Sequence, residues 1–114
     1  MSERLITQER DFEALYRSAF TAVGAGLVSS DILEKLSRHA LTEGFAISIL
    51  ETYLLKEGHE IPHPEYGISY VDYQEITKGV AGVEKAKFMR AEYEAILRQL
   101  RDQPDQFGFD VWFE

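Results

Sequence analysis

The sequence of 114 residues contains no cysteine. This absence excludes disulfide bonds, thiolate nucleophiles and cysteine-ligated zinc or iron–sulfur sites. No stretch approaches the roughly 18 uninterrupted apolar residues that a membrane-spanning helix needs. The first residues, MSERLITQERDFEAL, also lack the apolar core of a signal peptide. We therefore expect a cytoplasmic protein with no membrane partner.

Positive charge is scarce as well. The chain carries 12 Lys and Arg against 20 Asp and Glu, a net charge of −8 at pH 7. We expect no nucleic-acid partner, because phosphate contacts need a basic surface. Residues 39–77 and the chain from Asp102 onward are strongly acidic, whereas residues 78–101 are basic. We expect these regions to attract one another within the fold; an acidic face presented to a basic partner is the alternative.

Proline and glycine are few, with three and eight residues, and no repeat, low-complexity tract or linker occurs. Hydrophobic residues make up 45% of the chain, and they include seven Phe, six Tyr and one Trp. A chain of this length buries roughly two-thirds of the surface that its unfolded form exposes, enough for a packed core. The composition therefore predicts a single globular domain over residues 1–114.

Apolar residues recur at steps of three and four in the first part of the chain, which is typical of amphipathic helices. The first helix is predicted to begin after an N-cap at Thr7 and to stop at a glycine cap near Gly24. The second is predicted to begin at Ser30 or Asp31.

The run FAISILETYLL, residues 45–55, is predicted to continue this second helix, either through Gly44 or after a break there. A strand is the alternative, because the first five residues of the run alternate in hydrophobicity. The clearest helix of the chain is predicted over Val83 to Arg101, and the Asp102 to Pro104 segment ends it.

Two segments predict strands. Residues 107–113 alternate between apolar residues and others with a strict period of two, and residues 67–73 are rich in Tyr, Ile and Val. Residues 58–66 contain a glycine and two prolines and are predicted to form a loop. The fold class is therefore predicted as α+β, with about three main helices and a small antiparallel sheet or β-ribbon of residues 67–73 and 107–113. A mostly α-helical bundle with a terminal strand is the alternative.

The sequence HEIPH at residues 59–63 matches the H-E-x-x-H pattern of zinc-dependent proteases. That pattern works only on a helix, where both histidines share one face. Pro62 and Pro64 force this segment into an extended conformation, so we exclude the protease site. A looser metal site of His59, His63 and Glu65 remains as an alternative, and no cofactor is predicted.

Tyrosines next to acidic residues are typical of protein interfaces. We therefore predict partner-binding residues at Tyr66, Tyr70, Asp72, Tyr73 and Trp112, with packing into the core as the competing interpretation. The terminal strand, residues 107–113, lacks an evident neighbour and suggests pairing between two copies of the chain.

The leading functional hypothesis is a small, acidic, non-enzymatic protein of the accessory, inhibitor or immunity type. Such a protein regulates a larger protein by binding it, here through a basic surface of the partner. The alternative is a small enzyme or enzyme subunit with a histidine and carboxylate site within residues 59–72.

Overall fold

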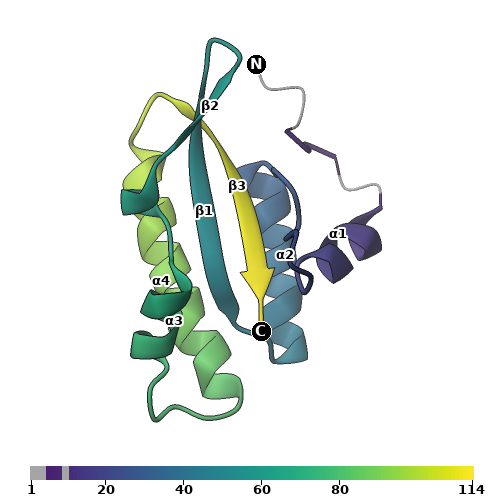
Figure 1. Cartoon of the computed structure of the whole chain (residues 1–114), viewed down its shortest axis with the longest axis vertical. Coiled ribbons are helices and arrows are strands. Elements are labelled where there is room, and N and C mark those ends of the chain that lie inside the picture. Colours follow the sequence, from purple (N-terminus) through teal and green to yellow (C-terminus); the bar gives the residue numbers. More distant parts are fainter. Residues whose placement is uncertain (1–4, 9–10) are drawn as a thin grey trace.

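The computed structural model describes residues 5–8 and 11–114 and confirms the α+β class. Within these residues, four α-helices accompany one three-stranded antiparallel sheet (Figure 1). In chain order the elements are α1 (Phe12–Ser18), α2 (Ser30–Glu43), β1 (Ile47–Lys56), β2 (His59–Pro62), the short 3-10 helix η1 (Pro64–Tyr66), α3 (Tyr70–Ile76), α4 (Val83–Arg101) and β3 (Gln106–Phe113). The helical-bundle alternative fits this arrangement less well.

The central strand of the sheet is β1, in the order β2-β1-β3. The prediction of a helix over residues 45–55 is therefore wrong, and the strand alternative holds. Gly44 ends α2 in the left-handed conformation, with φ 85°, so the helix cannot continue into this run. At the other end of β1, Glu57 and Gly58 have φ angles of 53° and 80°. Two successive residues with positive φ form a tight turn that favours a hairpin. The second strand of this hairpin is β2, so the prediction of a loop over residues 58–66 is wrong for residues 59–62.

The prediction of a strand over residues 67–73 is also wrong, because most of this segment is the helix α3. Ser69 is its N-cap: the Ser69 hydroxyl accepts from the Asp72 N–H at 3.1 Å, and the Asp72 carboxylate accepts from the Ser69 N–H at 2.9 Å. This reciprocal capping box stabilises a helix start that β propensity alone does not reveal. Only Ile68 pairs with the sheet, as an isolated bridge to Leu50.

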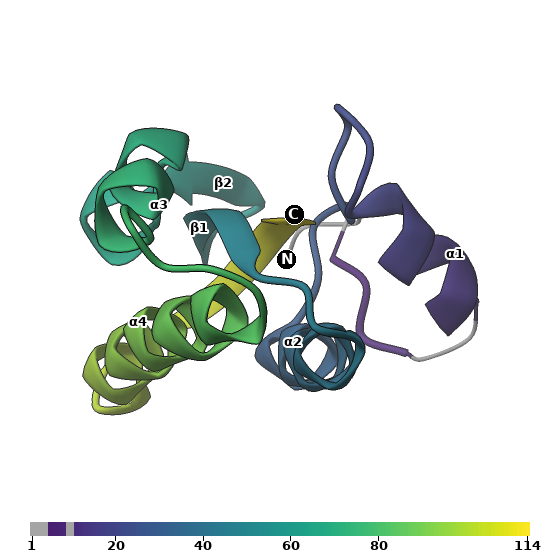
Figure 2. The ribbon, with the colours of Figure 1, turned by 90° about the horizontal axis from the view of Figure 1, so that it is seen from below.

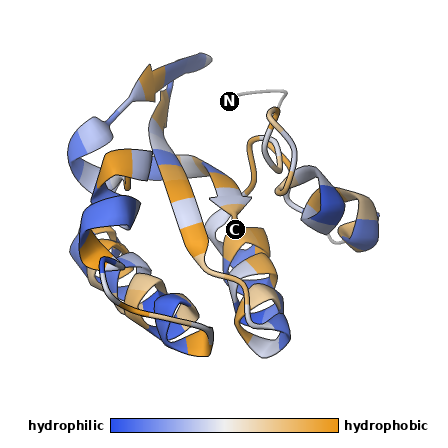
Figure 3. Ribbon diagram, turned by 60° about the horizontal axis from the view of Figure 1, so that its bottom comes forward, coloured by the Kyte–Doolittle hydropathy of each residue, from blue (hydrophilic) through white to orange (hydrophobic). Residues whose placement is uncertain are grey.

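Helices α2 and α4 cover one face of the sheet (Figure 2). Hydrophobic residues run along the central strands and along the sides of these helices that lie against them (Figure 3). The core between the layers includes Ile32, Leu33, Leu36, Leu50, Met89, Tyr93, Phe109 and Val111, each at most 2% exposed. Helix α4 begins and ends as predicted. Helix α2 begins at Ser30, but its N-cap is Ser29 rather than Ser30 or Asp31, with the Ser29 hydroxyl accepting from the Ile32 N–H at 3.3 Å.

The outer edge of β3 is occupied by the chain itself. Val28 exchanges two backbone hydrogen bonds with Phe109, at 2.7 and 2.9 Å, and the Ala25 N–H donates to the Val111 carbonyl at 3.2 Å. Since β1 pairs with the other edge, the expectation that residues 107–113 lack a neighbour is wrong.

The first helix is shorter than predicted, since α1 starts at Phe12, after Asp11. Thr7 is not its N-cap, because the neighbouring Ile6 pairs with Val28 in a parallel bridge. Residues 9 and 10, which the predicted helix includes, lie outside the described residues. Among the described residues, no helix combines the length and the apolar character that crossing a bilayer requires.

Candidate functional site

The face of the sheet opposite α2 and α4 is left partly open between α3 on one side and the turn before α2 on the other (Figure 2). Leu5 and Leu27 cover this face at Gly108. Side chains two residues apart on a strand share a face. Leu50 and Val111 are paired and buried against the helices, so their neighbours Glu51 and Asp110 lie on the opposite side. The open face is formed by Ile49, Glu51 and Tyr53 from β1 and by Asp110 and Trp112 from β3.

One part of this face is hollowed into a cavity of about 380 Å³ between β1, the end of β2 and the start of α3. Ile49 and Tyr53 line it from the sheet, and Pro62 and Tyr70 line it from the wall. The wall lies close to the sheet because residue 67 is glycine: a Cβ there would come within 2.7 Å of the Leu50 carbonyl oxygen. This cavity is suited to an apolar or aromatic side chain of a partner.

Beside the cavity, Glu51 and Asp110 are directly opposite each other on adjacent strands. The Tyr53 hydroxyl donates to Glu51 Oε1 at 3.0 Å, and the Gly26 N–H donates to Asp110 Oδ1 at 3.0 Å. Burial raises the pKa of Asp110, and the backbone N–H groups of Gly26, Val111 and Ala25 oppose this shift. The negative charge of Glu51 adds a smaller increase. Like charges at such a position destabilise a sheet, so the pair is unfavourable for the fold alone.

The turn before α2 packs against the same part of the face. Its Gly24 has φ 80°, and a Cβ there would lie 2.6 Å from both Asp110 Oδ1 and Trp112 Cε2. The Trp112 indole N–H donates to the Ala22 carbonyl at 3.4 Å. Trp112, half-buried, therefore lies beside Asp110 with its polar atom already bonded within the chain.

Cations are placed elsewhere in the described chain. Apart from Lys56 and Lys78, the described Lys and Arg residues lie on α1, α2 and α4. The ion pairs found within residues 5–8 and 11–114 include neither Glu51 nor Asp110. Within the same residues, no ion pair joins α4 to residues 39–77 or to the acidic end. The expected attraction between these regions is therefore not made through ion pairs of the described residues.

The predicted partner-binding residues separate into two groups. Tyr70 and Trp112 lie at the open face. Tyr70 is 40% exposed, and its hydroxyl donates to Glu114 Oε1 at 3.1 Å. This hydrogen bond raises the pKa of Tyr70. Asp72 caps α3 and lines the cavity. The prediction is wrong for Tyr73, which is 5% exposed and belongs to the core.

Tyr66 lies away from the open face. Its hydroxyl accepts from Gln103 Nε2 at 2.7 Å, and its ring is 6.4 Å from that of Phe107. Phe107 is on the helix-covered side of β3, so Tyr66 closes the end of the core rather than presenting a binding surface. Sequence reasoning missed Glu51, Tyr53 and Asp110, because only the register of two strands brings them together.

The proposed metal ligands do not converge. His63 Nδ1 contacts Glu65 Oε1 at 2.5 Å, whereas His59 lies at the far end of β2, opposite Lys56. A hydrogen bond from its own backbone, then His63, lowers the pKa of Glu65. Among the described residues, no three His, Asp or Glu side chains are arranged to hold a metal ion. The extended backbone at Pro62 is as predicted.

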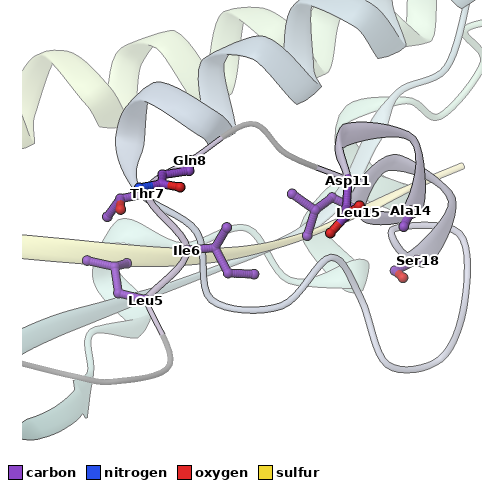
Figure 4. Close-up of a pocket in the computed structure, with 8 residues that line it drawn as sticks. All are labelled: Leu5, Ile6, Thr7, Gln8, Asp11, Ala14, Leu15 and Ser18. Carbon is purple, nitrogen blue, oxygen red and sulfur yellow. The ribbon is translucent and has the colours of Figure 1, made fainter.

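A second hollow, of about 420 Å³, lies between the segment Leu5 to Gln8 and α1 (Figure 4). Asp11 is the one ionisable side chain among the described residues that line it. It therefore offers less specific chemistry than the open face. No protein-family model, curated protein or solved structure matches this chain, so its function is argued from its own residues.

Proposed function

We propose that this chain is a non-enzymatic protein of the accessory, inhibitor or immunity type that regulates a larger protein by binding it. The open face of the sheet would receive a basic segment of that partner. The observation that carries the proposal is the combination, on one face, of an apolar cavity, partly exposed aromatic rings and two carboxylates that no described lysine or arginine pairs with. Protein interfaces favour such aromatic anchors, and complementary charge accelerates and orients association.

The face supports this proposal better than the sheet edges do. The two edges of β3 are occupied within the chain, which removes the basis for a homodimer through that strand. The remaining edge is β2, which has four residues. The His63 N–H donates to the Thr52 carbonyl of β1. Since hydrogen-bonded and non-hydrogen-bonded pairs alternate in an antiparallel ladder, the backbone groups of Glu60 and Pro62 point away from β1. Because proline has no N–H, this edge offers one outward donor, at Glu60.

The test compares two isoleucines on the sheet. Ile49→Arg places a cation on the open face. Ile61→Arg is the control and makes the same change on β2. The Ile61 side chain is 42% exposed, and because Ile61 is paired with Leu54 it lies on the other face of the sheet. Tagged wild-type protein and both variants are used to recover partners from the native cell, with quantitative mass spectrometry. We expect one protein to be recovered with wild type and Ile61→Arg, and at least about tenfold less of it with Ile49→Arg.

Circular dichroism and urea unfolding establish that both variants are folded before recovery is compared. Equal recovery of every stoichiometric partner by a folded Ile49→Arg protein would contradict the proposal.

A second function, a small enzyme, is favoured by one observation only. His63 and Glu65 form a histidine–carboxylate pair, the arrangement that orients a general base, and His63 also lines the cavity. A hydroxyl of the cavity wall, that of Ser69, is used to cap α3. Glu65→Gln separates the two functions, because Glu65 contacts His63 but is not among the residues that line the cavity. It would lower an activity of the chain but leave binding of the partner unchanged.

A further inference from the structure

We infer that Glu51 and Asp110 form a subsite for an arginine side chain of the partner, with Trp112 beside it. The inference rests on the proposed function and specifies which partner residue the open face recognises. It starts from the register of the sheet, which places the two carboxylates on one face of adjacent strands, directly opposite each other. Paired Cβ atoms in an antiparallel sheet are about 4.5–5.5 Å apart.

In the described part of the chain, neither carboxylate has a lysine or arginine as an ion-pair partner. Like charges directly opposite each other in a sheet cost stability, and a cation between them would offset that cost. The ion pairs found in the described part of the chain leave both Glu51 and Asp110 out. A cation brought by the partner would relieve the repulsion in the complex, so the free energy of binding would include that relief.

The surroundings favour a planar cation. The Tyr53 hydroxyl and the Gly26 N–H each hold one of the carboxylates in place, so their oxygen atoms are preorganised. A guanidinium donates from several N–H groups in one plane and can bridge two carboxylates, whereas an ammonium acts as a point charge. Trp112 adds an aromatic surface whose N–H is already bonded to Ala22, and arginine stacks on such surfaces.

A divalent cation fits this site less well. Calcium needs six to eight oxygen ligands and magnesium requires an octahedral set. Among the described residues, no group of three potential ligands with suitable spacing is present. The same carboxylates therefore match a partner's side chain better than a metal ion.

The test uses the single tryptophan of the chain as a local probe. Octa-arginine and octa-lysine peptides of equal charge are titrated into the full chain while Trp112 fluorescence and the indole N–H resonance are followed. We expect octa-arginine to change both signals with an affinity about five- to tenfold higher than that of octa-lysine. The double variant Glu51→Gln/Asp110→Asn should weaken octa-arginine binding by about tenfold or more.

The matched control is Glu57→Gln/Glu92→Gln, which removes the same charge from two exposed positions outside the open face. It should bind octa-arginine within about twofold of wild type, because the distant charges are largely screened. Equal affinity for the two peptides, or equal weakening by the two double variants, would overturn the inference and indicate unspecific attraction to an acidic surface.

Recovery of the partner separates this inference from the proposed function. If Ile49→Arg loses the partner while a folded Glu51→Gln/Asp110→Asn protein keeps it, the face binds a protein but the arginine subsite is wrong. If both keep it, the proposed function fails, and the inference fails with it. Loss of the partner in both, with the control unaffected, supports both.

Discussion

Half-buried carboxylates have different partners on the two faces of the sheet. On the helix-covered side, Glu34 of α2 is paired with Arg90 of α4 and accepts from the Tyr93 hydroxyl at 3.2 Å. On the open side, Asp110 is opposite another carboxylate, Glu51, and accepts from the backbone N–H groups of Gly26, Val111 and Ala25. The first carboxylate is paired with a cation within the fold, whereas no described lysine or arginine forms an ion pair with the second.

The difference separates a charge that the fold neutralises from a pair that we propose for recognition. Burial and the neighbouring Glu34 raise the pKa of Tyr93, so its hydroxyl remains a neutral donor that helps hold α2 against α4. Asp110 holds the turn before α2 through the Gly26 N–H, but the charge of Glu51 opposite it costs stability. A protein can retain such a cost at a position where binding requires charge.

The largest expected effect contrasts two neighbouring large side chains on opposite faces of β3. Phe109 is 2% exposed and belongs to the core, so Phe109→Ala should lower the free energy of unfolding by about 3–5 kcal/mol. Trp112 is half-buried on the open face, and Trp112→Ala should cost only about 1–2 kcal/mol. Urea unfolding followed by circular dichroism measures both. Equal losses would mean that the open face is as tightly packed as the core.

The next effect tests the compensated carboxylate. Arg90→Met removes the cation that pairs with Glu34 between α2 and α4 and leaves it only the exposed Arg38, 3.6 Å away. It should cost about 2–3 kcal/mol, since the Arg90 side chain is 16% exposed. Arg98→Met, on the exposed side of the same helix, should change stability by less than about 0.5 kcal/mol. The double variant Glu34→Leu/Arg90→Met should recover most of the loss, because it removes the unpaired charge. No recovery would show that Arg90 acts by packing alone.

The elements that the sequence predicts best are those whose pattern fits one period only. Helix α4 repeats apolar residues at helical spacing over 19 residues, and β3 alternates strictly, so both were predicted within about a residue. The run that became β1 fits both periods, and its pairing with two other strands decided the outcome. Two local signals argued for the observed structure: the Glu57-Gly58 turn and the Ser69-x-x-Asp72 cap.

The candidate site was less accessible to sequence reasoning. Tyr70 and Trp112 were predicted from their residue types, and both lie on the open face. Tyr73 has the same residue type and neighbourhood, yet it packs into the core. Composition could not predict this, because it does not indicate which side of α3 faces the sheet. Glu51 and Asp110 are separated by most of the second half of the chain, and only the β1–β3 register makes them neighbours.

A smaller effect tests how the turn before α2 supports the open face. Gly24 and Gly58 share φ 80°, but a Cβ at Gly24 would meet Asp110 and Trp112, whereas none of the described atoms lies within 4 Å of a Cβ at Gly58. Gly58→Ala should cost about 1 kcal/mol for the left-handed backbone alone. Gly24→Ala should cost about 2 kcal/mol and shift the Trp112 indole resonance, because the side chains must move. Equal losses without that shift would show that the turn does not position Trp112.

The smallest effect concerns the uncompensated pair itself. Glu51→Gln keeps an acceptor for Tyr53 but removes the charge opposite Asp110, so it should raise the free energy of unfolding at pH 7 by a few tenths of a kcal/mol, a gain limited by solvent screening. The pKa of Asp110 is raised in the folded protein, so wild type loses stability as pH rises from the ordinary carboxyl pKa through the folded one. Glu51→Gln should lower that folded pKa, measurable by NMR titration of the Asp110 carboxyl, and should flatten the loss. Glu92→Gln removes the same charge on the exposed side of α4 and should change neither the stability nor the pKa of Asp110. A stability gain of the same size in Glu92→Gln would show that the effect comes from net charge rather than from the pair.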